Sequence, residues 1–312
     1  MTKSILTNRL HLLRLLFALA IPKKFARSVK PAYLRRLYHS KKFKVELGKK
    51  SFFLSGTKNS LENSIFFNSL TGCDEGYSLE LFIKISEYKK DIIFWDVGAN
   101  SGVYTLVMRC INENSIIVAF EPAEGARSKL IINLKNNNYS FKELSQDQKS
   151  VDSIIIVDKA LSSSNKTLDF HYYNIDDDYT YGGRISTLST SSLRIETVKG
   201  ITAKAVGQSN SRLIPNFLKI DIEGFEYEAL LGFGNYLKNL EVIFIEILSD
   251  DLGIKIESLL SPTFFRFFDI NDKDRSIREF AHLRKSSCRN WLVIRRNSNF
   301  NLDPILSHYI GR

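Results

Sequence analysis

The sequence predicts an α/β protein built around a mostly parallel β-sheet with helices on both faces. Five short apolar runs occur in the middle of the chain, at 91–98, 115–122, 153–162, 215–224 and 241–248, and helical patterns separate several of them. Continuous apolar strands that alternate with helices are typical of a parallel sheet covered on both sides. With 312 residues, 44% of them hydrophobic, the chain is long enough to bury such a core.

The predicted elements follow one another in a regular order. The first strand leads through a turn to a helix at 102–111, whose apolar residues have helical spacing. The second strand leads to a helix at 123–138, which an asparagine cluster ends, and the fourth to a helix at 225–240. Two further apolar runs, at 264–270 and 290–296, predict a closing antiparallel pair.

Acidic side chains stand where the predicted parallel strands end. Ligands of such sheets bind at the carboxyl ends of the strands, near the switch in strand order. The acids at these ends are Asp96, Glu121, Asp158, Asp221 and Glu246. They are therefore the first candidates for a ligand site.

The turn after the first strand consists of small residues and includes Gly98, Asn100 and Gly102. Small residues let a ligand approach the backbone, and the helix that follows presents free N–H groups. The spacing is not the G-x-G-x-x-G of dinucleotide-binding folds, and Asp96 before it would repel a pyrophosphate. A cationic or neutral ligand fits better. S-adenosylmethionine is such a ligand, and Glu121 can accept hydrogen bonds from its ribose hydroxyls.

The cysteine content is low. Cys73, Cys110 and Cys288 are far apart in the sequence and form no C-x-x-C pair. This odd, sparse set argues against a disulfide framework and against a zinc site. The simpler interpretation is a reducing compartment, so a cytoplasmic location is expected.

The net charge of +10 is concentrated near the N-terminus. Residues 1–50 hold fourteen Lys or Arg residues and one acid, Glu46, so that the rest of the chain is net −3. A nucleic-acid-binding domain should carry the basic face on its folded body. The sequence therefore predicts no nucleic-acid partner.

Within this basic arm an apolar segment at 10–22 precedes a basic run at 23–44. The apolar segment is shorter than the roughly 20 residues that span a bilayer. Ala18 and Ala20 resemble the end of a signal peptide, but Arg14 interrupts the apolar part. Two interpretations stay open: peripheral contact with an anionic membrane at its inner face or with a partner enzyme, or a helix packed on the domain with solvated charges.

Six stretches occur in the order DVGANSGVYT, VAFEP, KALSS, STLS, FLKIDIEGFEYEALLG and IFIEI, across roughly half of the chain. In these stretches the chain resembles the FkbM-family methyltransferases, a branch of the Rossmann-like S-adenosylmethionine-dependent enzymes. KIDIEGFE is the more specific block, whereas DVGANSG alone would indicate only the superfamily. The resemblance implies the class I methyltransferase fold with a seven-stranded sheet, S-adenosylmethionine as cofactor, and usually O-methylation of sugars, lipopolysaccharide and other glycans, or of polyketides.

The resemblance also implies which residues bind the cofactor. The turn after the first strand would hold the methionine end, the acid after the second strand the ribose, and the residues after the third strand the adenine. These residues are Asp96, Gly98, Ala99, Asn100, Gly102, Glu121, Pro122, Asp158, Lys159 and Ala160.

Methyl transfer to a hydroxyl needs a positioned acceptor oxygen and a group that takes its proton. The KIDIEGFE block places Lys219, Asp221 and Glu223 on one side of the fourth strand for as long as the strand lasts. Asp221 is the first candidate for the base or for orienting the acceptor, and Glu223 is the second. Lys219 can pair with a neighbouring acid. Two later acids, Glu226 and Glu228, are expected on the exposed face of the next helix.

A divalent metal is not expected. Paired carboxylates, with Glu246, could hold one. However, the chain has no evident Asp-Asn pair of the kind that catechol methyltransferases use.

The stretch 168–212, between the third and fourth strands, is polar, aromatic and rich in turn residues. One interpretation is an insertion over the site, with His171 as a base and aromatic rings that stack on a sugar. The other is a surface hairpin with His171 exposed. The rings in question belong to Tyr172, Tyr173, Tyr179 and Tyr181.

The sequence thus predicts an S-adenosylmethionine-dependent O-methyltransferase that modifies a sugar hydroxyl in a glycan, glycolipid or lipopolysaccharide-type acceptor. Its domain is expected at 91–300, after the basic arm and a helical lead-in at 51–90 and before a tail at 301–312. The alternatives are an inactive cofactor-binding scaffold and an O-methyltransferase of a polyketide or another small metabolite. A nicotinamide-dependent oxidoreductase is disfavoured because the middle glycine is missing.

Overall fold

The computed structural model describes residues 42–55, 61–146, 148–149, 151, 154–174, 180–185, 194–298 and 302–309. The apolar segment of the arm and nearly all of its basic run lie outside the described residues. In the described part of the chain, no helix combines the length and the apolar character needed to cross a bilayer. The division of the chain into arm, lead-in, domain and tail stays a prediction.

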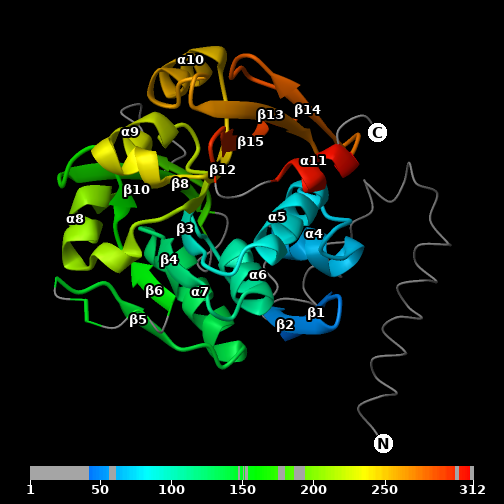
Figure 1. Cartoon of the computed structure of the whole chain (residues 1–312). Coiled ribbons are helices and arrows are strands. Elements are labelled where there is room, and N and C mark those ends of the chain that lie inside the picture. Colours follow the sequence, from blue (N-terminus) through cyan, green and yellow to red (C-terminus); the bar gives the residue numbers. More distant parts are fainter. Residues whose placement is uncertain are drawn as a thin grey trace, which may run out of the picture.

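A mostly parallel sheet forms the centre of the molecule (Figure 1). Its strands, in the part of the chain that the structure describes, lie in the order β14-β13-β15-β12-β11-β3-β4-β6-β5. From β12 to β5 all neighbours are parallel, whereas β15 is antiparallel to both β12 and β13. The strands are β3 (Ile93–Val97), β4 (Ile116–Phe120), β5 (Phe141–Glu143), β6 (Ile154–Val157), β11 (Phe217–Ile220), β12 (Val242–Glu246), β13 (Phe265–Asn271), β14 (Ser276–Phe280) and β15 (Asn290–Arg295).

All seven predicted strands are present, and the last two form the expected antiparallel pair, β13 and β15. Two unpredicted strands, β5 and β14, add to opposite edges, so the described sheet has nine strands rather than seven. β5 has three residues, and only Phe141 among them is apolar. In β14 only Ile277 is buried. Edge strands of this kind lack the apolar pattern that makes a strand recognisable.

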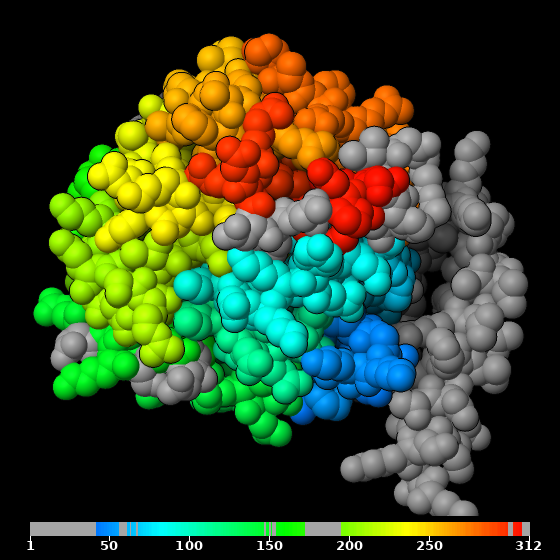
Figure 2. Space-filling model, in the orientation of Figure 1, coloured from blue at the N-terminus to red at the C-terminus, as the bar shows by residue number. Residues whose placement is uncertain are grey.

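Helices cover both faces of the sheet, as predicted (Figure 1). One face carries α5 (Gly76–Tyr88), α6 (Val103–Ile111) and α7 (Glu124–Asn136). The other carries α8 (Ala203–Ser209), α9 (Glu226–Leu231) and α10 (Asp250–Leu259). The short helices α4 (Leu61–Asn68) and α11 (Asp303–Tyr309) join the first face, where Figure 2 shows α11 beside α5.

Aromatic rings fill the core beneath α5. The Phe82 ring lies 5.3 Å from that of Phe94, 5.4 Å from Phe217 and 5.6 Å from Phe244, between centroids. These three partners come from β3, β11 and β12. Side chains alternate between the faces of a strand, so the residue two positions further on points to the same side. In these strands those residues are Asp96, Lys219 and Glu246.

A β-hairpin of β1 (Lys42–Leu47) and β2 (Lys50–Ser55) packs against α6 and α7 (Figures 1 and 2). Asparagine side chains near the C-terminal end of α7 hold this hairpin in place. Asn133 Oδ1 accepts a hydrogen bond from the Ser55 N–H at 2.9 Å, and the Asn137 side chain binds the same strand. The lead-in that was predicted as helical therefore begins with a strand.

The stretch predicted as an insertion forms most of a second, four-stranded sheet in the order β7-β10-β8-β9. Leu168, Phe170 and Val198 of this sheet pack against Ala123, which follows β4, and Phe225, which follows β11. It therefore lies close to the carboxyl ends of the central strands. Its strands are β7 (Ala160–Leu161), β8 (Thr167–Asn174), β9 (Thr180–Ile185) and β10 (Arg194–Ile201).

His171, in the middle of β8, is buried rather than exposed, with 3% of its surface accessible. Its Nδ1 has no hydrogen-bond partner among the described residues. This contradicts the interpretation of an exposed histidine on a surface hairpin. The side chains of the four tyrosines proposed to stack on a sugar lie outside the described residues.

Candidate active site

The carboxyl ends of the central strands carry a row of polar side chains on the face of α5 and α6. Parallel pairing places Lys219 of β11 opposite Asp96 of β3. On the other side, antiparallel pairing places Glu246 of β12 opposite Asn290 of β15. Glu121 follows β4 directly. The acids that were singled out in the sequence therefore share one edge of the sheet, as the parallel topology requires.

The glycine turn is built by left-handed backbone conformations. Gly98, Asn100 and Gly102 have φ values of 81°, 51° and 87°. A Cβ atom on Gly98 would lie 2.1 Å from the carbonyl oxygen of Asp221, and one on Gly102 would lie 2.3 Å from Leu130. Glycine is needed at both positions because other parts of the chain approach the turn closely, a reason that the motif alone did not reveal.

Glu121 is held by the backbone on both sides. Its Oε2 accepts from the Asn100 N–H at 2.8 Å, and its Oε1 accepts from the Ala123 N–H at 3.0 Å. Burial nonetheless raises its pKa to about 7, because these two bonds only partly offset the loss of solvation. The carboxylate thus ties the glycine turn after β3 to the turn after β4.

Asp96 is 2% exposed and accepts a hydrogen bond from the Thr105 hydroxyl at 2.6 Å. Burial raises its pKa to about 6, although Thr105 and the Lys219 charge act in the opposite direction. Thr105 comes from the first turn of α6, so the strand and the helix after the glycine turn are linked at this point.

The other predicted cofactor residues lie around these two acids. Ala99 is buried and its N–H donates to Phe120, while Pro122 is half-buried. Asp158 and Lys159 form the turn after β6, with Asp158 exposed, and Ala160 begins β7. All of them follow a central strand at its carboxyl end.

Lys219 and Asp221 form an ion pair, with Nζ 2.9 Å from Oδ2. Lys219 is 8% exposed, and its Nζ also lies over the Tyr104 ring, 4.8 Å from the centroid. Although burial disfavours the charged form, the carboxylates of Asp221 and Glu75 raise the pKa of Lys219 to about 12. The two carboxylates thus favour the charged form of the lysine, and the predicted pairing with a neighbouring acid is present.

The turn after β11 exposes Glu223, whose φ of 56° is left-handed. Glu226 lies beneath this turn and is fully buried. Its Oε1 accepts from the N–H groups of Ile222 and Gly224 at 3.0 and 3.2 Å, and burial raises its pKa to about 7. The expectation that Glu226 faces solvent was wrong, because its carboxylate caps the turn that presents Asp221 and Glu223.

Glu228 also differs from the expectation of an exposed side chain. It is half-buried, and its Oε2 accepts a hydrogen bond from the Ser163 hydroxyl at 2.6 Å. Ser163 follows β7, so this contact links α9 to the start of the second sheet.

Glu246 ends β12 with one oxygen 3.8 Å from the Arg289 guanidinium. The other oxygen, Oε2, is buried and has no hydrogen-bond partner among the described residues. Burial and the nearby charges of Asp221 and Glu223 raise the pKa of this carboxyl group.

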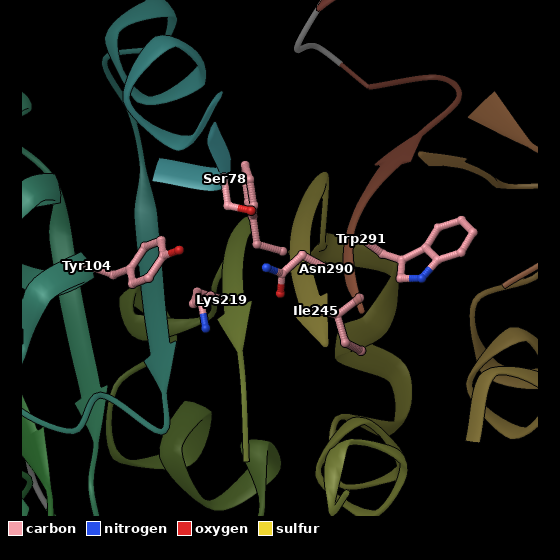
Figure 3. A pocket seen from close by; sticks show the side chains of 7 residues that line it. Ser78, Tyr104, Lys219, Ile245, Asn290 and Trp291 are labelled. Carbon is pink, nitrogen blue, oxygen red and sulfur yellow. The ribbon is translucent and has the colours of Figure 1, made fainter. Parts of the chain in front are cut away.

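A small hollow, partly open to solvent, lies beside the lysine (Figure 3). Ser78 at the start of α5 and Asn290 of β15 flank it, and both side chains donate to Asp272 Oδ2, at 2.7 and 2.9 Å. Sequence reasoning missed Ser78, Asp272 and Asn290, because these residues lie far apart in the chain and outside the quoted motifs. The lining residues are Ser78, Tyr104, Lys219, Phe244, Ile245, Asn290 and Trp291.

Within the described residues, no cluster of three or more His, Cys, Asp or Glu side chains is arranged to hold a metal ion.

The strand order, the glycine turn and the row of acids match the Rossmann-like fold of class I methyltransferases. The seven predicted strands lie in the order β6-β4-β3-β11-β12-β15-β13, with only β15 antiparallel to the rest. Residues 96–285, more than half of the chain, match the model of the methyltransferase FkbM domain. The protein belongs to the FkbM methyltransferase family, as the sequence motifs indicated.

One relative is the hexuronic acid methyltransferase AglP of Haloferax volcanii, which is 27% identical over 164 residues. The match covers 52% of this chain and 59% of AglP, so it spans less than two thirds of that protein.

Two solved structures match the chain with low sequence identity and low TM-scores. The methyltransferase FkbM of Methylobacillus flagellatus has 14% identity and a TM-score of 0.41, over 66% of this chain and 44% of that one. The precorrin-6y C5,15-methyltransferase of Geobacter metallireducens has 12% identity and a TM-score of 0.38, over 72% and 88% of the two chains.

Proposed function

We propose that this protein transfers the methyl group of S-adenosylmethionine to a hydroxyl group of a sugar in a glycan, glycolipid or lipopolysaccharide-type acceptor. The observation that carries the proposal is the row of Glu121, Asp96 and Asp221 at neighbouring strand ends, in a chain of the FkbM family. The sugar acceptor is supported by the relative AglP, which is described as a hexuronic acid methyltransferase.

The chemistry of these side chains fits S-adenosylmethionine. In the described structure each oxygen of Glu121 accepts one backbone hydrogen bond, and a carboxylate oxygen can accept a second one from a ribose hydroxyl. Asp96, buried beside the glycine turn, presents a negative charge to the cationic methionine end. Asp158, Lys159 and Ala160 would border the adenine.

When bound, S-adenosylmethionine supplies a methyl group on a positively charged sulfur, which is already a good leaving group. The protein must therefore orient the acceptor hydroxyl and take its proton. Asp221 has a suitable position for both roles, because it follows β11 directly and the Lys219 ammonium holds one of its oxygens. Glu226 fixes the turn on which both Asp221 and Glu223 stand.

The first experiment is calorimetric titration of the full chain with S-adenosylmethionine, with a nicotinamide dinucleotide as control. Micromolar binding of the sulfonium compound alone is expected. Transfer of labelled methyl groups to a panel of neutral and acidic glycosides and glycolipids would then identify the acceptor. Failure to bind S-adenosylmethionine, or transfer only to non-sugar hydroxyls, would contradict the proposal.

A further inference from the structure

Glu75 lies directly before α5, outside the family match and outside all the sequence motifs. Its Oε2 accepts a hydrogen bond from the Tyr104 hydroxyl at 3.0 Å. Tyr104 is the second residue of α6, immediately after the glycine turn, and its ring lies under the Lys219 ammonium. Glu75, Tyr104, Lys219 and Asp221 therefore converge on the strand-end row from three separate parts of the chain. Figure 3 shows two of them, Tyr104 and Lys219, beside each other.

Stability of α5 does not explain the position of the Glu75 side chain. Glu75 is the N-cap residue of this helix, yet it makes no side-chain capping bond. Asp272 of the loop after β13 caps the helix instead, because its Oδ1 accepts from the N–H groups of Tyr77 and Ser78 at 3.1 and 2.7 Å. The Glu75 carboxylate is turned toward the site and not toward its own helix.

Carboxylates outnumber cations at this point of the site. Glu75, Asp96 and Asp221 all interact electrostatically with Lys219. Burial, and then the like charge of Asp221, raise the pKa of Glu75, while Lys219 lowers it. Three buried or half-buried acids around one lysine leave an excess of negative charge, and a bound cation would relieve it.

We propose that Glu75 is a further cofactor-binding residue, which with Asp96 forms a cation-binding wall that favours the charged methyl donor over its neutral-sulfur product. This inference rests on the proposed function. In the transfer, the carbon–sulfur bond breaks and its electron pair stays on sulfur. The new oxygen–carbon bond forms, and the hydroxyl proton passes to a carboxylate of the site. The positive charge at sulfur is then lost, while the α-amino group of the product stays charged. The attraction between Glu75 and the sulfur therefore ends, and the product dissociates more easily.

Calorimetric titration of the full chain with S-adenosylmethionine and with S-adenosylhomocysteine tests this inference. Glu75→Gln removes the charge but keeps an oxygen that can accept from Tyr104. Its affinity for S-adenosylmethionine should fall about tenfold, while that for S-adenosylhomocysteine changes less than about twofold. Glu87→Gln is the matched control: it removes an exposed carboxylate from the same helix, and both affinities should stay unchanged.

Binding of S-adenosylhomocysteine also reports whether Glu75→Gln is folded. An equal loss of affinity for both ligands would overturn the inference. It would mean that the Glu75 carboxylate contacts a part of the molecule that both ligands share, or that it stabilises the fold. No loss for either ligand would overturn it as well. If the wild-type chain binds neither ligand, the proposed function itself fails, a result distinct from the other two.

Discussion

The two halves of the strand-end row differ in how far the protein itself satisfies their carboxylates. In the half proposed to bind the cofactor (the cofactor half), Glu121 accepts two backbone hydrogen bonds and Asp96 accepts one from a threonine hydroxyl. In the half proposed to bind the acceptor (the acceptor half), Glu226 and Glu246 each keep a buried oxygen without a hydrogen-bond partner among the described residues, and Glu223 is exposed. Hydrogen bonds within the protein thus hold the carboxylates of the first half in place, whereas the second half contains buried oxygens that no described residue satisfies.

This difference follows from how each half is assembled. The cofactor half comes from two consecutive strand–turn–helix units, so short-range backbone geometry sets it. The acceptor half is assembled from α5, α6, β11, β12 and β15, which are distant in sequence. A preorganised cofactor site is useful for methyl transfer because it fixes the donor before the acceptor arrives. Substitutions in each half can test whether the two halves do have these different roles.

The largest effect is expected at Asp221. Asp221→Asn keeps the shape of the side chain but cannot take a proton, so turnover on an identified acceptor should fall about 10²- to 10⁴-fold, as expected for loss of a general base. S-adenosylmethionine should still bind in calorimetry, because the cofactor half is intact. Glu223→Gln is the control for the second candidate base. If Glu223→Gln abolished turnover and Asp221→Asn did not, the assignment of the base would be reversed.

The next effect is on stability and concerns the close approach of Gly98, in the glycine turn, to the backbone of Asp221. Gly98→Ala would place a Cβ atom 2.1 Å from the Asp221 carbonyl oxygen, and the φ of 81° at Gly98 is unfavourable for alanine. The substitution should therefore lower the free energy of unfolding by about 3 kcal/mol or more. Gly234→Ala is the matched control, since Gly234 has a φ of 50° with nothing within 4 Å of its Cβ position. Gly234→Ala should lower the free energy of unfolding, measured by urea denaturation, by only about 1 kcal/mol. Equal losses in the two variants would show that the close approach is unimportant.

A smaller effect on binding is expected at Glu121. Glu121→Gln turns one accepting oxygen into an amide N–H₂ that faces a backbone donor, and it removes the charge. The affinity for S-adenosylmethionine should fall about 10- to 100-fold. This loss corresponds to the roughly 1.5–3 kcal/mol that a hydrogen bond to a charged group contributes. Because the ribose is common to both ligands, S-adenosylmethionine and S-adenosylhomocysteine should weaken equally in calorimetry. Glu124→Gln, an exposed acid in the first turn of α7, should change neither. Unequal losses at Glu121 would place it near the sulfur instead.

The cofactor half was the part that the sequence could predict. Asp96, the glycine turn and Glu121 lie within one continuous stretch, and the apolar strands around them predicted that they would meet at one edge. The same reasoning placed Asp221 at the next strand end and anticipated the ion pair of Lys219.

The missed features depend on contacts between distant segments. Glu75 and Asp272 are single acids in loops, and nothing near them in sequence indicates that one faces Tyr104 and the other caps α5. Glu226 was misplaced because helical periodicity describes only its position on α9, and not the turn above it that buries its carboxylate. The edge strands β5 and β14 were missed because each is short and mostly exposed.

The smallest predicted effect is a pH dependence of stability at Glu226, in the acceptor half. Burial raises the pKa of Glu226 from 4.5 to about 7, so the folded chain holds this proton more tightly than the unfolded chain does. The contribution of Glu226 to stability is therefore most favourable below about pH 4.5 and is lost as the pH rises toward 7.

The variant Glu226→Gln tests this prediction because glutamine resembles the protonated form of the side chain. It keeps the oxygen that accepts hydrogen bonds from the N–H groups of Ile222 and Gly224. Its amide nitrogen replaces Oε2, which has no hydrogen-bond partner among the described residues. The variant should thus gain about 1–2 kcal/mol over the wild type between pH 5 and pH 8 in urea denaturation. Glu87→Gln should show no such pH-dependent gain. A constant difference between Glu226→Gln and the wild type across this pH range would mean that the folded protein accommodates the charged form of the Glu226 carboxyl group, and would contradict the prediction.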